Sequence, residues 1–374
     1  MDRRLLVIVL AEVVLILLGI YGYAIAYAPT QSVSSISPTN GEPVTLTGAG
    51  ATLSYPLLSV VAGKFQSDHP GITINYEPIG SIAGISQFIV RTVDFAATYP
   101  PMTQQQRNIA PGIPLHIPEA ISVVVVAYNV PGLTDRLKLT GNVTADIFLG
   151  KIKMWTDPEI TVLNPGQTFP DKPINTWHMS EAEGTTFVFT SYLSSVSPTF
   201  RDKLGFGTSV PWTIGVSVPT DAGVASLMQS TPYSVGYMEL SYALQTSLSY
   251  AALQNSQGNY IVPSSSSAGP AEQQLKRDLP SASQDWSDVN LLNEPGADAY
   301  PLVTFTYLLV YQNFSIQSSM DLAKAKALAS FLWYLVHDGQ SLGAPLGYVP
   351  LPANVVAIDE TGIKSIVFQG QQLI

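Results

Sequence analysis

The sequence contains no cysteine, and only 12% of its 374 residues are charged. The absence of cysteine excludes disulfides, thiolate metal sites and cysteine nucleophiles. The 17 Lys and Arg residues form no basic run and are outnumbered by 27 Asp and Glu residues. Because nucleic-acid binders concentrate positive charge on one face, we expect no nucleic-acid partner.

Catalytic signatures are equally scarce. The sequence has no G-x-S-x-G turn and no recognisable Ser/His/Asp constellation, so we expect neither enzymatic activity nor a cofactor. Only four histidines occur, and none stands in an H-E-x-x-H pattern. His178 lies close in sequence to Glu181 and Glu183, but the other three histidines are far away along the chain. We therefore expect no metal site.

The first 28 residues include a long apolar run. Arg3 and Arg4 precede this run, which continues to about Ala28 and is interrupted by Glu12 and two glycines. About 20 apolar residues suffice to cross a bilayer as a helix, and the flanking arginines stay in the cytoplasm. We predict a single-pass transmembrane anchor over residues 1–28 that leaves the rest of the chain outside the cell membrane.

This amino-terminal segment has alternative interpretations. The small-x-small motif Ala24-Ile25-Ala26 also fits a cleaved signal peptide, although the apolar region of a signal peptide usually runs about 7 to 15 residues. Glu12 is costly in lipid unless it is protonated or paired. It is either a docking residue for a partner helix or a tolerated neutral acid.

The remaining residues predict a linker followed by an α/β fold. Residues 29–43 are rich in Ser, Thr and Pro and have little apolar surface, which is typical of a linker. From Val44 onward strands, glycine turns and helices alternate, and this alternation predicts a largely parallel sheet. The continuous β-branched run at 121–130 predicts a strand buried on both faces that crosses between lobes. Two lobes are expected because single cores rarely exceed about 250 to 300 residues.

Seven segments stand out in sequence order: LTGAGATL (46–53), ITINYEPIGSIAGISQF (72–88), VDFAATYPPM (93–102), ADIFLGKIKMWTDP (145–158), EGTTFVFTSYL (183–193), VGYMELSYAL (235–244) and PGADAYPL (295–302). Together they resemble the successive motifs of periplasmic phosphate-binding proteins. The resemblance implies a type II periplasmic-binding-protein fold, with lobe 1 formed by residues 44–118 and 295–374 and lobe 2 by residues 119–294. It also implies a ligand between the lobes, and an ABC permease and ATPase as partners.

Three of these segments contain a glycine turn that enters a predicted helix. The amino terminus of a helix presents unpaired N–H groups and a partial positive charge, so such turns can hold an anion. Taken alone, a glycine turn is more often mere chain geometry. The resemblance implies that hydroxyls and backbone amides of five residues surround the phosphate: Thr52, Leu53, Ser81, Gly184 and Thr185.

Other positions depart from the family pattern. Tyr99 stands where the family has an aspartate that accepts the proton of hydrogen phosphate, and Met179 stands where it has an arginine. Glu183 replaces a hydroxyl donor, and Glu181 lies two residues before it. Since a charge-assisted hydrogen bond contributes about 1.5 to 3 kcal/mol, loss of the arginine alone weakens anion binding by roughly ten- to a hundredfold.

These departures allow several interpretations. Glu183 can replace Tyr99 as the proton acceptor, so that the site binds a protonated phosphate. Alternatively, Glu181 and Glu183 receive a cationic or hydroxyl-rich solute against the Tyr99 ring. A third possibility is a scaffold or accessory subunit of a surface or membrane complex that has no small ligand. The simplest interpretation makes both glutamates exposed acids favoured by the helix dipole.

Our leading expectation is an extracytoplasmic solute-binding protein that captures phosphate for an ABC importer. For such a protein the surface outside the membrane is open to modification. Asn142 and Asn313 each begin an Asn-x-Ser/Thr acceptor pattern and are possible glycosylation sites.

Overall fold

The computed structural model describes residues 43–264 and 279–374. The predicted anchor at 1–28 and nearly all of the predicted linker lie outside the described residues. The polar, serine-rich sequence between 251 and 288 also predicts a short helix around Glu272 to Lys276, which lies outside them too. Within the described ranges, no helix is both long enough and apolar enough to span a bilayer.

The first half of the main sheet confirms the predicted alternation of strands and helices. Strand β1 (Val44–Gly50) pairs in parallel with β2 (Ile72–Pro78) on one side and with β3 (Phe95–Thr98) on the other. In β2, buried and exposed residues alternate at first, as expected of a strand with one covered face. Strand β12 (Val303–Tyr311) pairs antiparallel with β3 and is buried throughout.

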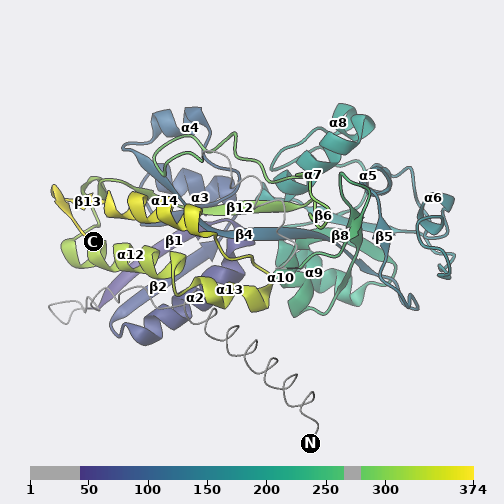
Figure 1. Cartoon of the computed structure of the whole chain (residues 1–374), viewed down its shortest axis with the longest axis horizontal. Coiled ribbons are helices and arrows are strands. Elements are labelled where there is room, and N and C mark those ends of the chain that lie inside the picture. Colours follow the sequence, from purple (N-terminus) through teal and green to yellow (C-terminus); the bar gives the residue numbers. More distant parts are fainter. Residues whose placement is uncertain (1–42, 265–278) are drawn as a thin grey trace, which may run out of the picture. The chain divides into compact units, whose positions relative to one another are not determined.

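Strand β4 (Pro114–Asn129) joins the two halves of the sheet (Figure 1). Its first part pairs antiparallel with β12, and its second part pairs antiparallel with β8 (Ser234–Glu239). The strand starts earlier than the predicted run at 121–130. The sequence pattern did not reveal its first part, because the prolines, His116 and Glu119 there are unusual in a buried strand, yet all of them are buried. The β4–β12 register shifts where Glu119 has no opposite residue, which marks a bulge between the lobes.

The second half of the sheet is smaller and parallel beyond β8. Strand β6 (Asn175–Met179) pairs in parallel with β8 and with β7 (Val216–Val218). We define lobe 1 as the part built on β2, β1, β3, β12 and the start of β4, and lobe 2 as the part built on the end of β4 with β8, β6 and β7. The residue boundaries predicted for the lobes stay a prediction.

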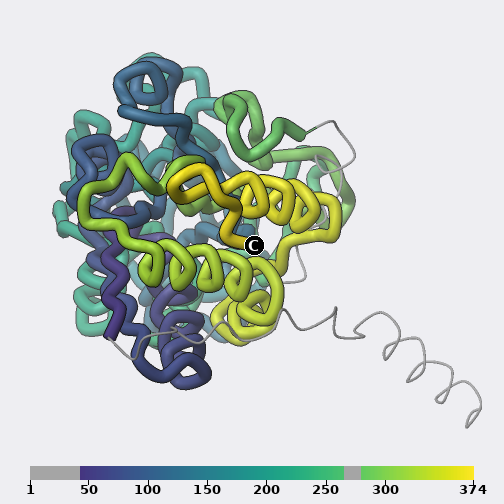
Figure 2. The backbone as a smooth tube through the Cα atoms, turned by 90° about the vertical axis from the view of Figure 1, so that its left-hand side faces the viewer, coloured from purple at the N-terminus to yellow at the C-terminus, as the bar shows by residue number. Residues whose placement is uncertain are grey.

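Helices cover the sheet of each lobe. In lobe 1, α12 (Leu322–Val336) contacts α14 (Ala353–Lys364), and the two lie side by side in Figure 2. Helix α12 begins where the Asp321 side chain accepts a hydrogen bond from Lys324 N at 2.8 Å, and it buries Leu328, Phe331 and Leu335 among other apolar residues. Each fully buried side chain of this size contributes about 1.5 to 3 kcal/mol. The apolar periodicity of residues 321–337 predicts a helix, and α12 confirms it.

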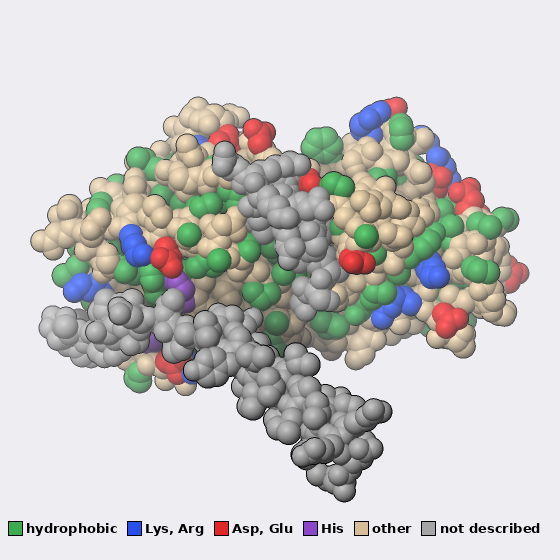
Figure 3. Space-filling model, viewed as in Figure 1, with side chains coloured by type: hydrophobic (Ala, Val, Ile, Leu, Met, Phe, Trp, Pro, Cys, Tyr) green, Lys and Arg blue, Asp and Glu red, His purple; other side chains and the backbone are tan. Residues whose placement is uncertain are grey.

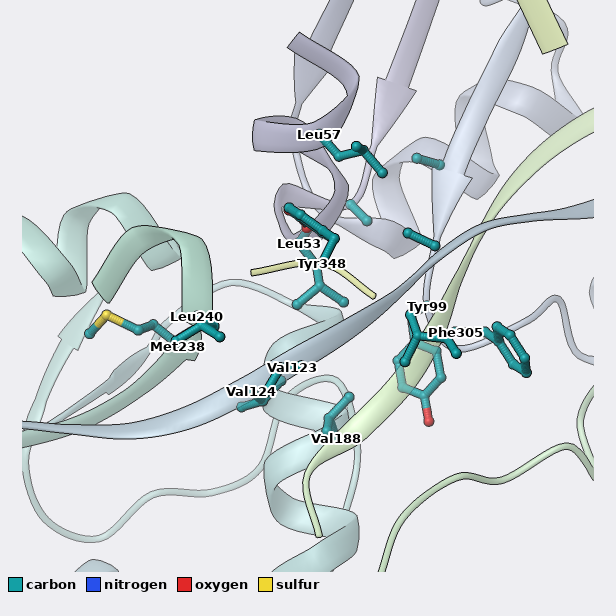
Figure 4. Packing of buried hydrophobic residues seen from close by; sticks show 14 of the residues in the cluster. Leu53, Leu57, Tyr99, Val123, Val124, Val188, Met238, Leu240, Phe305 and Tyr348 are labelled. Atoms are coloured by element: carbon teal, nitrogen blue, oxygen red, sulfur yellow. Dashed lines mark hydrogen bonds between the residues drawn. The ribbon is translucent and has the colours of Figure 1, made fainter. Parts of the chain in front are cut away.

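The apolar core continues between the lobes along β4. Figure 4 shows Leu53 and Tyr348 from lobe 1, and Val188 and Leu240 from lobe 2, gathered around this strand. All four side chains are at most 1% exposed. Dense packing at this position joins the lobes by a continuous core as well as by strand β4.

The helical elements that the following sections use, or that complete the fold, have these bounds: η1 Thr52–Ser54, α2 Tyr55–Asp68, α3 Ser81–Ile89, α4 Gln104–Ile109, α5 Gly141–Phe148, α6 Pro158–Thr161, α7 Gly184–Val196, α8 Pro198–Lys203, α9 Asp221–Ser230, α10 Leu240–Gln245, η2 Phe314–Ile316, α13 Gln340–Gly343 and η3 Ala344–Leu346. The short strands are β5 Lys138–Leu139, β9 Ser249–Tyr250, β10 Ala252–Gln254, β11 Tyr260–Ile261, β13 Val367–Phe368 and β14 Gln371–Gln372.

Candidate functional site

Three helix starts meet where the two lobes touch. Strand β1 leads through Gly50 into η1 and α2, and β2 leads through Gly80 into α3. On lobe 2, β6 leads through Glu183 into α7. A Cβ atom placed on Gly184 would lie 2.6 Å from Tyr99 O, so the start of α7 lies directly against lobe 1. In α/β sheets, ligands bind at such strand ends.

The five residues that the family resemblance implies as phosphate contacts are all buried at this junction. Ser81 Oγ accepts a hydrogen bond from Tyr99 N at 3.2 Å, so the hydroxyl proton of Ser81 is available to another acceptor. The carbonyl of Leu53 accepts a hydrogen bond from the Tyr348 hydroxyl at 2.7 Å. The buried residues are Thr52, Leu53, Ser81, Gly184 and Thr185. Their role in binding stays a prediction.

Glu183 reaches from lobe 2 to lobe 1. The residue precedes the first turn of α7, its side chain is 0% exposed, and its Oε2 lies 2.9 Å from Thr52 Oγ1. Its Oε1 is buried and makes no well-aligned hydrogen bond within the described residues. The interpretation of Glu183 as an exposed acid at a helix start is wrong, because its carboxyl group lies between the lobes.

Asp221 is a second buried acid at the same hydroxyl. It occupies the first turn of α9, where Thr220 caps the helix, and its Oδ2 lies 3.0 Å from Thr52 Oγ1 and 3.1 Å from Thr185 Oγ1. Its Oδ1 accepts a hydrogen bond from Glu239 N at 2.9 Å. Asp221 was not among the predicted site residues. An acid placed just after a strand, at the start of a helix, is the signal that could have identified it.

Burial changes the acidity of these carboxyl groups. It raises the pKa of Glu183 to about 8, the nearby Asp221 carboxyl adds to the rise, and the Thr52 hydroxyl opposes it. Burial also raises the pKa of Asp221, against hydrogen bonds from Glu239 N–H, Thr52 and Thr185. The pKa of Glu239, which contacts the Ser241 hydroxyl, lies well above its usual range for the same reason. Glu183 is therefore expected to be protonated at neutral pH.

These acids lack a cationic partner in the described part of the chain. Within residues 43–264 and 279–374, neither Glu183 nor Asp221 forms an ion pair with Lys or Arg. On the face of the molecule drawn in Figure 3, Lys and Arg side chains are few and scattered rather than gathered in a patch. The described residues thus offer hydroxyls, amides and carboxyl groups to a ligand, and none of them pairs a Lys or Arg side chain with Glu183 or Asp221.

The other predicted site residues lie nearby in different settings. Met179 is buried in lobe 2, where its sulfur accepts a hydrogen bond from Thr186 Oγ1 at 3.5 Å. The ring of Tyr99 packs edge-on against Phe187 of α7, with ring centres 5.7 Å apart, and so closes the junction from lobe 1. Glu181 is exposed, as the simplest interpretation expects, although its charge contributes to the raised pKa of Glu183.

Residues considered for metal binding and glycosylation lie away from this junction's centre. The ring of His178 stacks on Trp212 at 4.9 Å between ring centres, and its Nδ1 lies 3.2 Å from Met179 O. Asn142 and Asn313 are both exposed, and Asn313 Oδ1 accepts a hydrogen bond from Ser315 N at the start of η2. Their glycosylation stays a prediction.

Comparison with known proteins decides the family. The profile of the PBP superfamily domain matches residues 35–338. The chain belongs to the PBP superfamily. It is 38% identical to phosphate-binding protein PstS of Xylella fastidiosa over 87% of this chain and 88% of that protein. It is 36% identical to PstS of Methanocaldococcus jannaschii over 88% of this chain and 89% of that protein.

A solved structure has a similar fold. The phosphate-binding protein from Stenotrophomonas maltophilia superposes with a TM-score of 0.64 at 17% identity, covering 84% of this chain and 92% of that one. The family resemblance recognised in the sequence and the two-lobed α/β fold that it implied are both confirmed.

Proposed function

We propose that this protein is an extracytoplasmic solute-binding protein that captures phosphate between its lobes and delivers it to an ABC importer. The observation that carries the proposal is the convergence of Thr52, Ser81 and Thr185 at three helix starts between the lobes. Hydroxyls and amides at helix starts favour oxyanions without a cation. The relatives named phosphate-binding protein, at up to 38% identity over most of the chain, support phosphate as the solute.

In this proposal each lobe contributes part of the site. Lobe 1 supplies the hydroxyls of Thr52 and Ser81 and the amide of Leu53, and lobe 2 supplies Gly184 and Thr185. The amino-terminal segment tethers the protein to the membrane, which keeps the binding lobes next to a permease and its ATPase. The charged and apolar pattern of residues 1–28 supports the tether.

Calorimetric titration of the full-length chain with phosphate tests the proposal. We expect saturable binding at about pH 5, where Glu183, whose pKa is raised to about 8, is neutral and repels the anion least. The test variant is Thr52→Val, whose side chain has nearly the same shape but lacks the hydroxyl, and we expect it to bind phosphate more weakly than the wild type. Equal binding by both proteins, or no heat with either, contradicts the proposal.

One observation favours a second candidate, a relative that serves as a scaffold or accessory subunit without a small ligand. The hydroxyls of Thr52 and Thr185 already contact carboxyl groups of the protein itself. In a scaffold these contacts would hold the lobes together permanently. This second candidate would be supported if phosphate changed neither the tryptophan fluorescence nor the heat of titration, and if small-angle scattering showed the lobes closed both with and without phosphate.

A further inference from the structure

The two Asn-x-Ser/Thr patterns of the sequence lie in different structural settings. Asn142 is exposed in the first turn of α5. Thr144, which completes the same pattern, is 0% exposed, and its hydroxyl donates a hydrogen bond to Thr140 O at 2.8 Å. The hydroxyl that the acceptor pattern requires is therefore buried on a helix, where a glycan-transferring enzyme cannot reach it in the folded protein.

The pattern that begins at Asn313 is accessible. Asn313 and Ser315 are both exposed, and Asn313 Oδ1 accepts a hydrogen bond from Ser315 N at 3.0 Å. This bond closes a tight turn, residues 313–315, which we call the acceptor turn. Ser315 Oγ accepts a hydrogen bond from Gln369 N at 2.6 Å, so its proton stays available to another acceptor. Among the described residues, Asn313 Nδ2 has no hydrogen-bond partner. The amide and the hydroxyl of the pattern are thus presented together.

The acceptor turn lies far from the candidate solute site. Asn313 forms an isolated bridge with Val367 of β13, which Figure 1 shows on the side of lobe 1 away from lobe 2. Strand β12 runs antiparallel to β3, so its last residue, Tyr311, lies at the sheet edge opposite to the helix starts of the junction. A group attached to Asn313 therefore leaves the junction open.

Apolar side chains surround the acceptor turn. Val90 and Ile113 are 65% and 54% exposed, and Ile316 is half-buried. Arg91 Nη1 donates a hydrogen bond to Ile316 O at 2.9 Å, and Gln312 N donates to Ile113 O at 2.9 Å. These bonds hold the three apolar residues beside the turn, and we call them the apolar patch. Exposed apolar side chains that gather in this way usually mark a surface that another group covers.

We propose that Asn313, and not Asn142, carries an N-linked glycan that covers the apolar patch. A glycan is bulky and solubilising, and its sugar rings can turn C–H groups toward apolar side chains while their hydroxyls remain in water. The proposal shares with the proposed function only the location of the lobes outside the membrane. It requires no solute.

The modification is a group transfer from a polyprenyl-linked glycan phosphate. A bond forms between Asn313 Nδ2 and the anomeric carbon of the first sugar, while the bond between that carbon and the phosphate oxygen breaks. The phosphate leaves with the electron pair, and the amide nitrogen loses one proton to a base of the transferring enzyme. The Ser315 hydroxyl can hydrogen-bond to the reacting amide group, which explains why an accessible hydroxyl favours this pattern over the one at Asn142.

Glycopeptide mass spectrometry of the full-length chain, purified from the cells that naturally produce it, tests the proposal. We expect a glycan on the peptide that contains Asn313 and none on the peptide that contains Asn142. Asn313→Gln should lose the glycan mass, and the matched control Asn142→Gln should keep it. Ser315→Ala should also lose the glycan although Asn313 is still present, whereas Ser315→Thr should retain it. An unmodified Asn313 in the wild type, or a glycan on Asn142, overturns the proposal.

A second measurement tests whether the glycan covers the apolar patch. In light scattering, Asn313→Gln should self-associate at lower protein concentrations than the wild type, and adding Val90→Ser and Ile113→Ser should remove this tendency. Equal self-association of the wild type and Asn313→Gln contradicts the covering role. Phosphate titration of Asn313→Gln should match the wild type, so a glycan on Asn313 in a chain that binds no phosphate would reject the proposed function alone.

Discussion

Asp94 in lobe 1 and Asp221 at the junction are both buried aspartates, yet they are stabilised differently. Asp94 Oδ1 lies 2.8 Å from Lys324 Nζ, and its Oδ2 accepts a hydrogen bond from Thr47 N at 2.7 Å. Among the described residues, Asp221 has hydroxyl and amide donors but no ion pair with a cation. Lobe 1 thus balances its buried acid with a positive charge, while the charge at the junction depends on whether its acids are protonated. We expect pH to affect the junction much more than the interior of lobe 1.

The largest expected effect comes from breaking the ion pair of Asp94. In Asp94→Ala the ammonium group of Lys324, whose side chain is 16% exposed, loses its partner. We expect the free energy of unfolding to fall by about 3 kcal/mol or more, because removing one partner leaves a poorly solvated charge. Urea unfolding followed by circular dichroism measures the change. The double variant with Lys324→Met should recover part of the loss, and an unchanged stability of Asp94→Ala would contradict the comparison.

The next effect concerns the proton on Glu183. Its pKa rises from an ordinary 4.5 to about 8 in the folded protein, so the folded state binds more protons than the unfolded chain between these values. The stabilising contribution is complete below about pH 4.5 and is lost as pH rises through 8. Each pH unit between the two pKa values changes the free energy of unfolding by about 1.4 kcal/mol, so the loss between about pH 5.5 and about pH 7 is about 2 kcal/mol. We expect this loss to disappear in Glu183→Gln.

Urea unfolding at several pH values checks this expectation. The other acids with raised pKa values, such as Asp221 and Glu239, contribute their own pH dependence to both proteins. The difference between wild type and Glu183→Gln therefore isolates Glu183. Parallel stability curves for the two proteins would show that Glu183 ionises at its ordinary pKa.

A smaller effect follows from removing one donor to Asp221. The Thr185→Val variant keeps the shape of the side chain but loses the hydrogen bond of 3.1 Å to Asp221 Oδ2. We expect a loss of about 1.5 kcal/mol above pH 7, since hydrogen bonds to charged groups contribute about 1.5 to 3 kcal/mol. The loss should shrink in acid as Asp221 takes up a proton. An equal loss at all pH values would mean that Asp221 is already neutral.

The smallest effect is expected for an exposed ion pair. Lys64 and Asp68 lie one turn apart on α2 with their side chains 51% and 39% exposed. Exposed pairs of this kind contribute little because water screens them and long side chains lose freedom. Lys64→Met should leave the melting temperature unchanged within error. A clear decrease would show that the exposure of an ion pair does not predict its contribution to the stability of this protein.

The sequence predicted the elements whose patterns are regular. The strands at 44–50 and 72–78, the helix at 322–336 and the glycine turns at Gly50 and Gly80 all follow from apolar periodicity and turn chemistry. The first part of β4 was missed, because Glu119 and two prolines look like a loop in isolation and are explained only by pairing with β12. Local pattern cannot reveal a strand whose polar residues are buried by another part of the chain.

The candidate site was predictable to a similar extent. The resemblance identified Thr52, Ser81 and Thr185, which the fold brings together from three separate segments. It did not identify Asp221, which lies far from Thr185 in sequence and outside all seven segments that resemble the family motifs. Its importance arises from a distance of 3.0 Å to Thr52, and such proximity depends on tertiary structure alone.

The shared strand β4 also limits how this protein can be divided. Its first part completes the sheet of lobe 1 through β12, and its second part completes the sheet of lobe 2 through β8. Each lobe expressed by itself would therefore present an unpaired strand edge, which is a site for aggregation. Circular permutants with new termini in surface loops should tolerate rearrangement, provided that Pro114–Asn129 stays continuous.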